Sequence, residues 1–102
     1  MNWQQLLQRL QQFVGAGQVT TYGNCSMWAF NHRGGGPAVG AMLQAIANNG
    51  QQLWSNRVVQ DDGGIAVPPA LANGQQFQLQ QEGVPFDPQG HVDWTQIVPV
   101  VL

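Results

Sequence analysis

The side chains best suited to chemistry in this chain follow one another at Ser55, Asn56 and Arg57. A serine hydroxyl attacks another molecule only when a neighbouring base removes its proton, because an unactivated hydroxyl is scarcely ionised near pH 7. Asn56 is not such a base, since an amide donates and accepts hydrogen bonds but does not shuttle protons in this range. The segment therefore predicts no covalent catalysis.

The single cysteine, Cys25, falls on the apolar side of a predicted helix. Nothing near it in sequence would lower the thiol pKa from about 8.5, so we expect an unreactive core residue. One cysteine excludes an internal disulfide and a cysteine-based zinc cage, and His32 and His91 are too few for one. Asp61 and Asp62 resemble the start of a calcium loop whose other ligands are missing. We expect no metal and no cofactor.

Length and composition predict one domain over residues 1–102 with one modest core. Hydrophobic residues make up 43% of the chain and charged residues only 8%. No apolar run approaches the roughly 18 residues that a membrane span requires. The first residues lack the pattern of a signal peptide, so we expect a cytoplasmic protein with no membrane partner.

Charge argues against strong attraction to nucleic acid. The only cations are Arg9, Arg33 and Arg57, and with five acidic residues the net charge is −2. Proteins that bind DNA usually gain affinity by neutralising phosphates with a basic face. The long-range field of this chain would repel DNA, so any binding must come from local geometry.

Hydrophobic periodicity predicts the helices that position these residues. Apolar residues at helical spacing predict a first helix after Asn2, a plausible N-cap, that ends at Gly15. A second helix runs from Tyr22 to Ala29, with Thr20 or Thr21 as its cap. Glycines 34–36 predict a turn, followed by a third helix over residues 37–49 that begins with proline and stops at Asn48-Asn49-Gly50.

The second half of the chain predicts less regular structure. Residues 57–59 and 65–67 are short β-branched runs around a glycine turn, which is typical of a hairpin. A glutamine-rich segment predicts a closing helix that ends at Gly83. The apolar residues 97–102 need a partner, which is either the first helix or another subunit.

Four segments resemble one family, the alkylguanine-DNA alkyltransferases and the related non-enzymatic alkyltransferase-like proteins. Residues 14–23 (VGAGQVTTYG) are similar to the family's entry into its helix-turn-helix, and residues 53–59 (LWSNRVV) to its active-site signature. Residues 37–49 resemble its recognition helix, and Glu82-Gly83-Val84 its closing cap. The resemblance covers residues 13 to 94 and implies a mainly α fold, a winged-helix-like helix-turn-helix domain with a small β-hairpin wing.

The residues that carry out alkyl transfer in that family are replaced here. When the motifs are aligned, Ser55 occupies the position of the family's acceptor cysteine and Asn56 that of the neighbouring histidine. Pro37 occupies the position of the arginine that takes the place of the flipped base. Arg33 is the nearest cation and could substitute if the turn folds back, or it is an exposed loop charge. Arg57 is kept, and the resemblance implies that it ties the loop to surrounding backbone carbonyls. The chain is therefore expected not to be an enzyme.

Two aromatic residues leave alternatives open. The alkyltransferase-like branch carries tryptophan in place of the acceptor cysteine, so with one extra loop residue Trp54 rather than Ser55 would form the pocket floor. Its ring could stack on a flipped purine, or it could fill the pocket and simply pack. The resemblance implies that Tyr22 works against the DNA backbone, whereas by itself Tyr22 reads as a buried tyrosine with a satisfied hydroxyl.

Two functions follow from this resemblance. The first is non-catalytic recognition of alkylated guanine in double-stranded DNA, with a repair protein as a further partner. The alternative is a degenerate paralogue that uses the scaffold to bind protein or a small molecule without DNA affinity. The candidates for the lesion or ligand pocket are Tyr22, Trp54, Ser55, Asn56 and Arg57. The candidates for the DNA-facing helix are Pro37, Ala38, Gly40, Ala41, Gln44 and Asn48.

Overall fold

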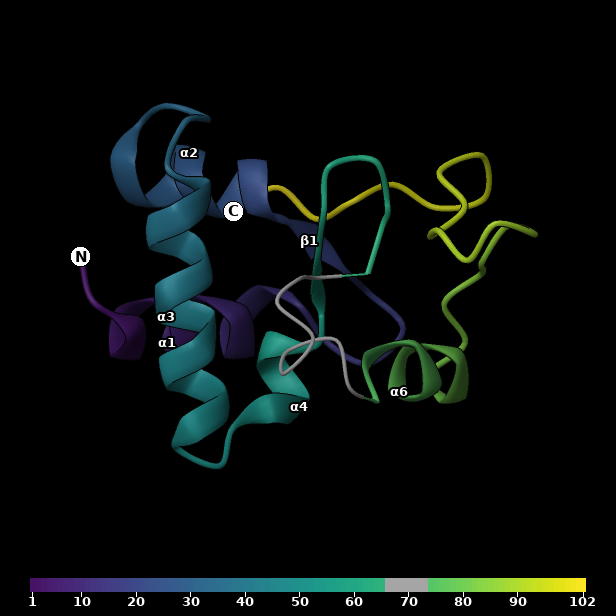
Figure 1. Ribbon diagram of the computed structural model, residues 1–102, viewed down its shortest axis with the longest axis horizontal. Helices are drawn as coiled ribbons and strands as arrows, with labels where there is room; N and C mark the ends of the chain where they lie inside the picture. The colour runs from purple at the N-terminus through teal and green to yellow at the C-terminus, as the bar shows by residue number, and fades with distance from the viewer. Residues whose placement is uncertain (66–73) are drawn as a thin grey trace.

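The fold is mainly helical, as the sequence predicts. A computed structural model describes residues 1–65 and 74–102. In these residues the helices are α1 (Trp3–Phe13), α2 (Tyr22–Phe30), α3 (Gly36–Asn48), α4 (Gln52–Ser55) and α6 (Gln75–Gln81), and the strands are β1 (Thr20–Thr21) and β2 (Val58–Val59). Helices α1 and α3 lie on one side of the strands and α6 on the other (Figure 1).

Helix α1 begins where its capping residues require. The Asn2 side chain accepts a hydrogen bond from the Gln5 amide at 2.9 Å, and the Gln5 side chain accepts one from the Asn2 amide at 3.0 Å. This capping box satisfies two backbone donors that a helix start leaves free. Leu6 and Leu10 are fully buried on the inner face, and the helix ends one residue before Val14. The predicted start is confirmed, whereas the helix ends two residues before Gly15, where it was expected to stop, and its C-cap is Val14.

The turn between α2 and α3 is tightly packed. Thr21 is the residue that caps α2, because its hydroxyl accepts from the Asn24 amide at 3.0 Å. Gly35 donates to the Ser26 hydroxyl at 2.9 Å and is buried. A Cβ at this position would lie 2.6 Å from the Phe30 ring and 2.7 Å from Ser26 Oγ. The glycine turn is therefore a requirement of packing as well as of chain direction.

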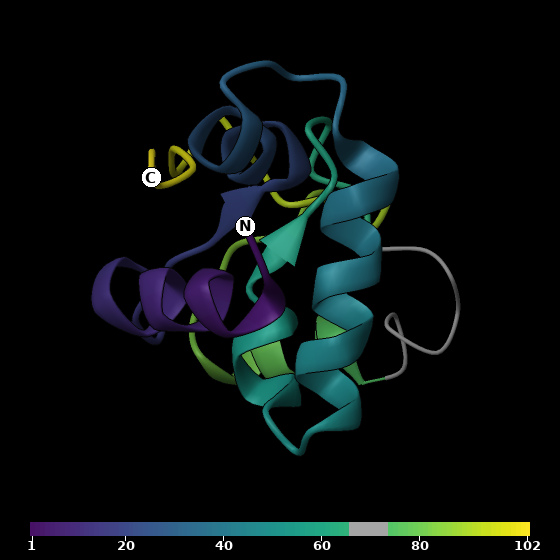
Figure 2. The same ribbon diagram turned by 90° about the vertical axis from the view of Figure 1, so that its left-hand side faces the viewer.

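The two strands pair in parallel, with Thr20 opposite Val58 and Thr21 opposite Val59. Because successive strand residues point to opposite faces, the two valines enter different cores. Val58 packs into a cluster with residues of α1, α2 and α3, and Val59 packs into one with Val19, α6 and the segment after it. In Figure 2, which looks at the molecule from the side of these two helices, β2 is visible between α1 and α3. This pairing joins segments that α2, α3 and α4 separate, and sequence periodicity did not predict it.

The segment that resembles the family's active-site signature, residues 53–59, is partly helical. Residues Gln52–Ser55 form the one-turn helix α4, whose end leads through Asn56 and Arg57 into β2. The chain then reverses at residues 60–64, where Gln60 donates to the Gly64 carbonyl at 3.0 Å. The turn of the predicted hairpin is thus present. The second run of this hairpin was predicted at residues 65–67, and residues 66 and 67 lie outside the described residues.

The last segments close both cores. Helix α6 ends at Gln81, and Gly83 has the left-handed φ of 89° that was expected to stop it. The Val100 amide donates to the Val19 carbonyl at 2.8 Å, and Val100 and Leu102 pack against the cluster that contains α1. Of the two partners predicted for residues 97–102, the first helix is the one observed.

Candidate functional site

Arg57 is a buried clamp between three segments. Its Nε lies 3.0 Å from Glu82 Oε1, its terminal nitrogen NH2 lies 2.7 Å from Oε2, and NH1 lies 3.3 Å from the Val14 carbonyl. The side chains of Arg57 and Glu82 are only 5% and 12% exposed. Burial raises the pKa of the Glu82 carboxyl, but the hydrogen bonds and the positive charge of Arg57 outweigh it and hold this pKa below its usual value. All of these contacts tie the fold together.

Trp54 lies directly beside this clamp. The guanidinium carbon of Arg57 is 4.6 Å from the centroid of the Trp54 ring, a cation–π contact. The ring is half-buried and packs against the core cluster that contains α1. One face of Trp54 is thus occupied by Arg57, and a base could stack only on the other face or after Arg57 moves.

Ser55 and Asn56 are buried and make hydrogen bonds within the domain. The Ser55 hydroxyl donates to the Gln52 carbonyl at 3.2 Å, inside α4. The Asn56 side chain donates to Gln78 Oε1 at 2.8 Å and so connects α4 to α6. Both residues are less than 7% exposed. Neither contact activates the hydroxyl of Ser55, and the described part of the chain encloses no cavity of ligand size.

Tyr22, the first residue of α2, does not have the satisfied hydroxyl expected of a buried tyrosine. Its hydroxyl is buried, yet it has no hydrogen-bond partner among the described residues. Burial, together with the nearby Cys25, raises the pKa of this phenol. The ring lies against α3, since a Cβ on Gly40 would be 3.8 Å from Tyr22 Cε2. Tyr22 is therefore half-buried between two helices with an unsatisfied hydroxyl.

Cys25 is a core residue, as predicted. It is fully buried, and burial, followed by the negative charge of Asp61, raises the pKa of its thiol to about 12. Almost none of the thiol is ionised near pH 7, so Cys25 is not a nucleophile in the folded protein.

The predicted DNA-facing residues lie on the outer side of α3. Pro37, Ala38, Ala41 and Asn48 are exposed, and Gly40 and Gln44 are half-buried. The Gln44 side chain donates to Asn48 Oδ1 at 3.0 Å along the helix. This surface carries no charge and no side chain longer than glutamine, so another molecule can approach the helix backbone closely.

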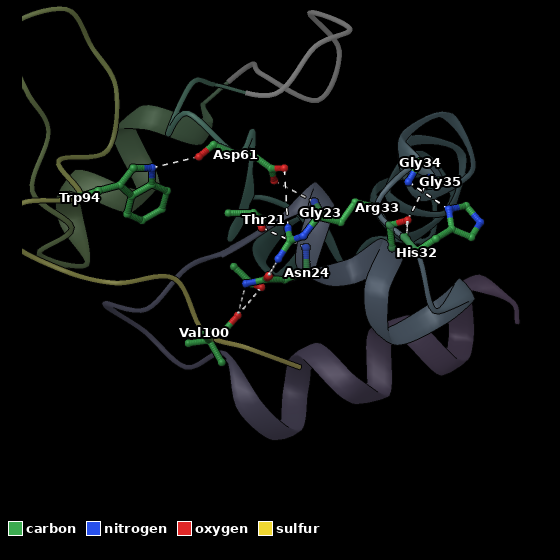
Figure 3. A network of polar contacts seen from close by, with 12 residues as sticks. Thr21, Gly23, Asn24, His32, Arg33, Gly34, Gly35, Asp61, Trp94 and Val100 are labelled. Atoms are coloured by element: carbon green, nitrogen blue, oxygen red, sulfur yellow. Dashed lines mark hydrogen bonds and ion pairs between the residues drawn. The ribbon is translucent and has the colours of Figure 1, made fainter.

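All three arginines are engaged within the domain. Arg57 pairs with Glu82, and Arg9 donates to the Leu102 carbonyl and lies over the rings of Phe13 and Trp28 at 4.3 and 5.5 Å. The turn that carries Arg33 folds back, so that its NH1 lies 3.9 Å from Asp61 Oδ2. Figure 3 shows Arg33 directed toward Asp61 and Gly23.

Two contacts at the candidate site were not predicted from the sequence. Asp61 was considered only as the start of a calcium loop, but its carboxylate accepts from the Gly23 amide at 2.9 Å. Glu82 was considered only as part of a helix cap, but it is the partner of Arg57. Both contacts join segments far apart in the chain, so no local spacing marks them.

No protein-family model, curated protein or solved structure matches this chain. In the described residues, no group of three or more histidines, cysteines and carboxylates is placed to hold a metal ion. The helices in the described ranges are all too short or too polar to cross a membrane. What the sequence motifs imply about family, winged-helix topology and partners therefore stays a prediction.

Proposed function

We propose that this domain is a non-catalytic, cytoplasmic DNA-binding protein of the alkyltransferase-like kind, which recognises alkylated guanine in double-stranded DNA. Helices α2 and α3 would act as its helix-turn-helix, with residues 57–67 as the wing. The observation that carries the proposal is the outer face of α3, which is uncharged, lined by small residues and backed by the Tyr22 ring at Gly40. Such a face allows the backbone of a helix to approach a DNA groove closely.

The buried groups of the site support binding without chemistry. Ser55 donates its hydroxyl to a main-chain carbonyl, Asn56 bonds to Gln78, and the Cys25 thiol has a pKa of about 12. None of the three can act as an ionised nucleophile near neutral pH. In this proposal a damaged base stacks on Trp54, on the face opposite Arg57 or after Arg57 moves, and is not transferred to the protein.

The charges predict weak binding to undamaged DNA. Each phosphate that a protein neutralises steepens the dependence of log K on log salt by about 0.9. With three arginines that are already engaged within the domain, the slope should stay below about 2.7 even if all of them were released. Preference for a lesion must then arise where the base itself is held.

Fluorescence anisotropy at low salt tests this function. We expect a duplex with one methylated guanine to bind at least about fivefold more tightly than its undamaged twin, because stacking of one base contributes about 1–3 kcal/mol. Trp54→Ala should remove the difference. Leu53→Ala is the matched control, since Leu53 is the adjacent residue of α4 and is half exposed. Equal, millimolar-range binding of both duplexes by the intact protein would refute the function.

One observation favours the alternative, a scaffold that binds another protein. Leu53 and Phe77 are 50% and 68% exposed, and the Gln78 side chain, next to Phe77, donates to the Leu53 carbonyl at 2.8 Å. Contiguous exposed apolar patches mark protein contact surfaces, and these two residues would form the centre of one. If this alternative holds, Leu53→Ser with Phe77→Ser should abolish partner binding, and neither duplex should bind in the anisotropy experiment.

A further inference from the structure

Arg33 and Asp61 form an exposed ion pair at the start of α2. Arg33 NH1 lies 3.9 Å from Asp61 Oδ2, and the two side chains are 61% and 58% exposed. Asp61 also accepts from the Gly23 amide at 2.9 Å, and Arg33 NH2 lies 3.4 Å from Asn24 Oδ1 (Figure 3). The pair therefore holds the turn between α2 and α3 against the first turn of α2.

The pair lies close against the backbone of α2. A Cβ on Gly23 would be 2.4 Å from Arg33 NH1 and 2.5 Å from Asp61 Oδ2. Gly23 follows Tyr22, whose ring lies beside Gly40 of α3, so the ion pair and the ring that backs α3 occupy consecutive positions at the start of α2. The arginine of the turn that leads into α3 is thus paired with an internal carboxylate.

Arg33 is the arginine that can be released at the smallest cost. Arg57 is buried with Glu82, and Arg9 is half-buried against two aromatic rings. Ion pairs between exposed side chains contribute little to stability, because water and salt screen them. Separating Arg33 from Asp61 would therefore leave the fold intact.

We propose that Asp61 is an autoinhibitory residue for DNA binding, which holds Arg33 on α2 and withholds it from the phosphate backbone. This inference rests on the function proposed above and concerns the regulation of the same surface. When the ion pair opens, the guanidinium of Arg33 becomes the one mobile cation of the turn that leads into α3. It then contacts a phosphate beside the bound lesion.

Two isosteric substitutions separate this effect from net charge. Asp61→Asn keeps an oxygen that accepts from Gly23 but removes the charge that holds Arg33. Asp62→Asn changes the net charge equally, and its side chain keeps an acceptor for the Gly64 amide, which Asp62 binds at 2.8 Å. The double variant Arg33→Ala with Asp61→Asn reports whether Arg33 carries the gain.

The probe is a duplex with one methylated guanine, measured by fluorescence anisotropy at about 50 and about 200 mM salt. Asp61→Asn should bind more tightly than Asp62→Asn at the lower salt. This advantage should shrink about 3.5-fold at the higher salt, because one further phosphate contact adds about 0.9 to the slope. The double variant should lose the advantage.

Each other outcome overturns the proposal. If the intact protein binds the lesion but Asp61→Asn and Asp62→Asn bind equally at both salts, autoinhibition is wrong while lesion binding stands. If the double variant keeps the advantage of Asp61→Asn, Arg33 is not the released cation. If neither the intact protein nor any variant binds the duplex with methylated guanine, the proposed function fails together with this inference.

Discussion

The guanidinium of Arg57 binds both carboxylate oxygens of Glu82, at 3.0 and 2.7 Å, across 25 positions of the chain. A two-point pair of this kind fixes orientation as well as distance. Because NH1 of Arg57 also reaches the Val14 carbonyl, the pair joins the end of α1, the entry to β2 and the end of α6. It is a buried polar connection between the two cores.

Glu82→Gln should destabilise the domain by about 3 kcal/mol. Removing one partner of a buried pair leaves the other charge uncompensated, which typically costs about 3–5 kcal/mol, and the 12% exposure of Glu82 places the effect at the lower end. Urea denaturation measures the change. Gln81→Ala, at the exposed neighbouring position of α6, is the control and should change stability by less than about 0.5 kcal/mol. Equal stabilities of the two variants would contradict the prediction.

The same pair predicts a loss of stability in acid. The pKa of Glu82 is lower in the folded protein than in the unfolded chain, where it is about 4.3. The contribution is therefore complete above that value and is lost as the pH falls toward the folded pKa. Hydrogen bonds from Thr95 and Gln96 also lower the pKa of Asp93, so protonation of Asp93 adds to the loss of stability in acid. Urea denaturation between pH 6 and pH 3 measures the free energy of unfolding. Below about pH 4.3 this free energy should fall less steeply for Glu82→Gln than for the intact protein.

We expect no transfer of an alkyl group to this protein. Ser55 lacks a base, and Cys25 is buried with a pKa of about 12. Mass spectrometry after incubation with DNA that contains alkylated guanine should show an unchanged mass. An increase mapped to Ser55 would mean that the hydroxyl is activated, and one mapped to Cys25 would mean that the thiol becomes accessible.

Cys25 should also resist thiol reagents until the protein unfolds. Its side chain is fully buried, and only the thiolate reacts readily. Modification by iodoacetamide at neutral pH should be slow in buffer and rapid in concentrated urea. Equal rates in the two solvents would show that the core around Cys25 opens easily.

Gly35→Ala should destabilise the turn between α2 and α3 by about 1–3 kcal/mol, because the added Cβ would lie 2.6 Å from Phe30 and 2.7 Å from Ser26 Oγ. Gly15→Ala is its control, because a Cβ at Gly15 would make only an ordinary contact, 3.5 Å from Gln18 Oε1. Thermal denaturation should therefore show a lower melting temperature for the first variant only.

The sequence by itself determined the features that depend on neighbours in the chain. The cap at Asn2, the threonine cap of α2, the turn before α3 and the stop at Gly83 were all predicted. Helix starts and stops are set by hydrogen bonds and backbone preferences within a few residues, so they can be read locally. The identities of Ser55 and Asn56 likewise led to the prediction that no neighbouring base activates the serine.

Only the tertiary structure decided which distant side chains meet. The parallel pairing of β1 with β2, the Arg57–Glu82 clamp over Trp54 and the attachment of Arg33 to Asp61 each join separate segments. These contacts depend on how the helices pack around two cores, and packing brings together residues whose separation in the chain has no period. The sequence therefore named the residues of the candidate site, while their burial and their partners followed from long-range packing.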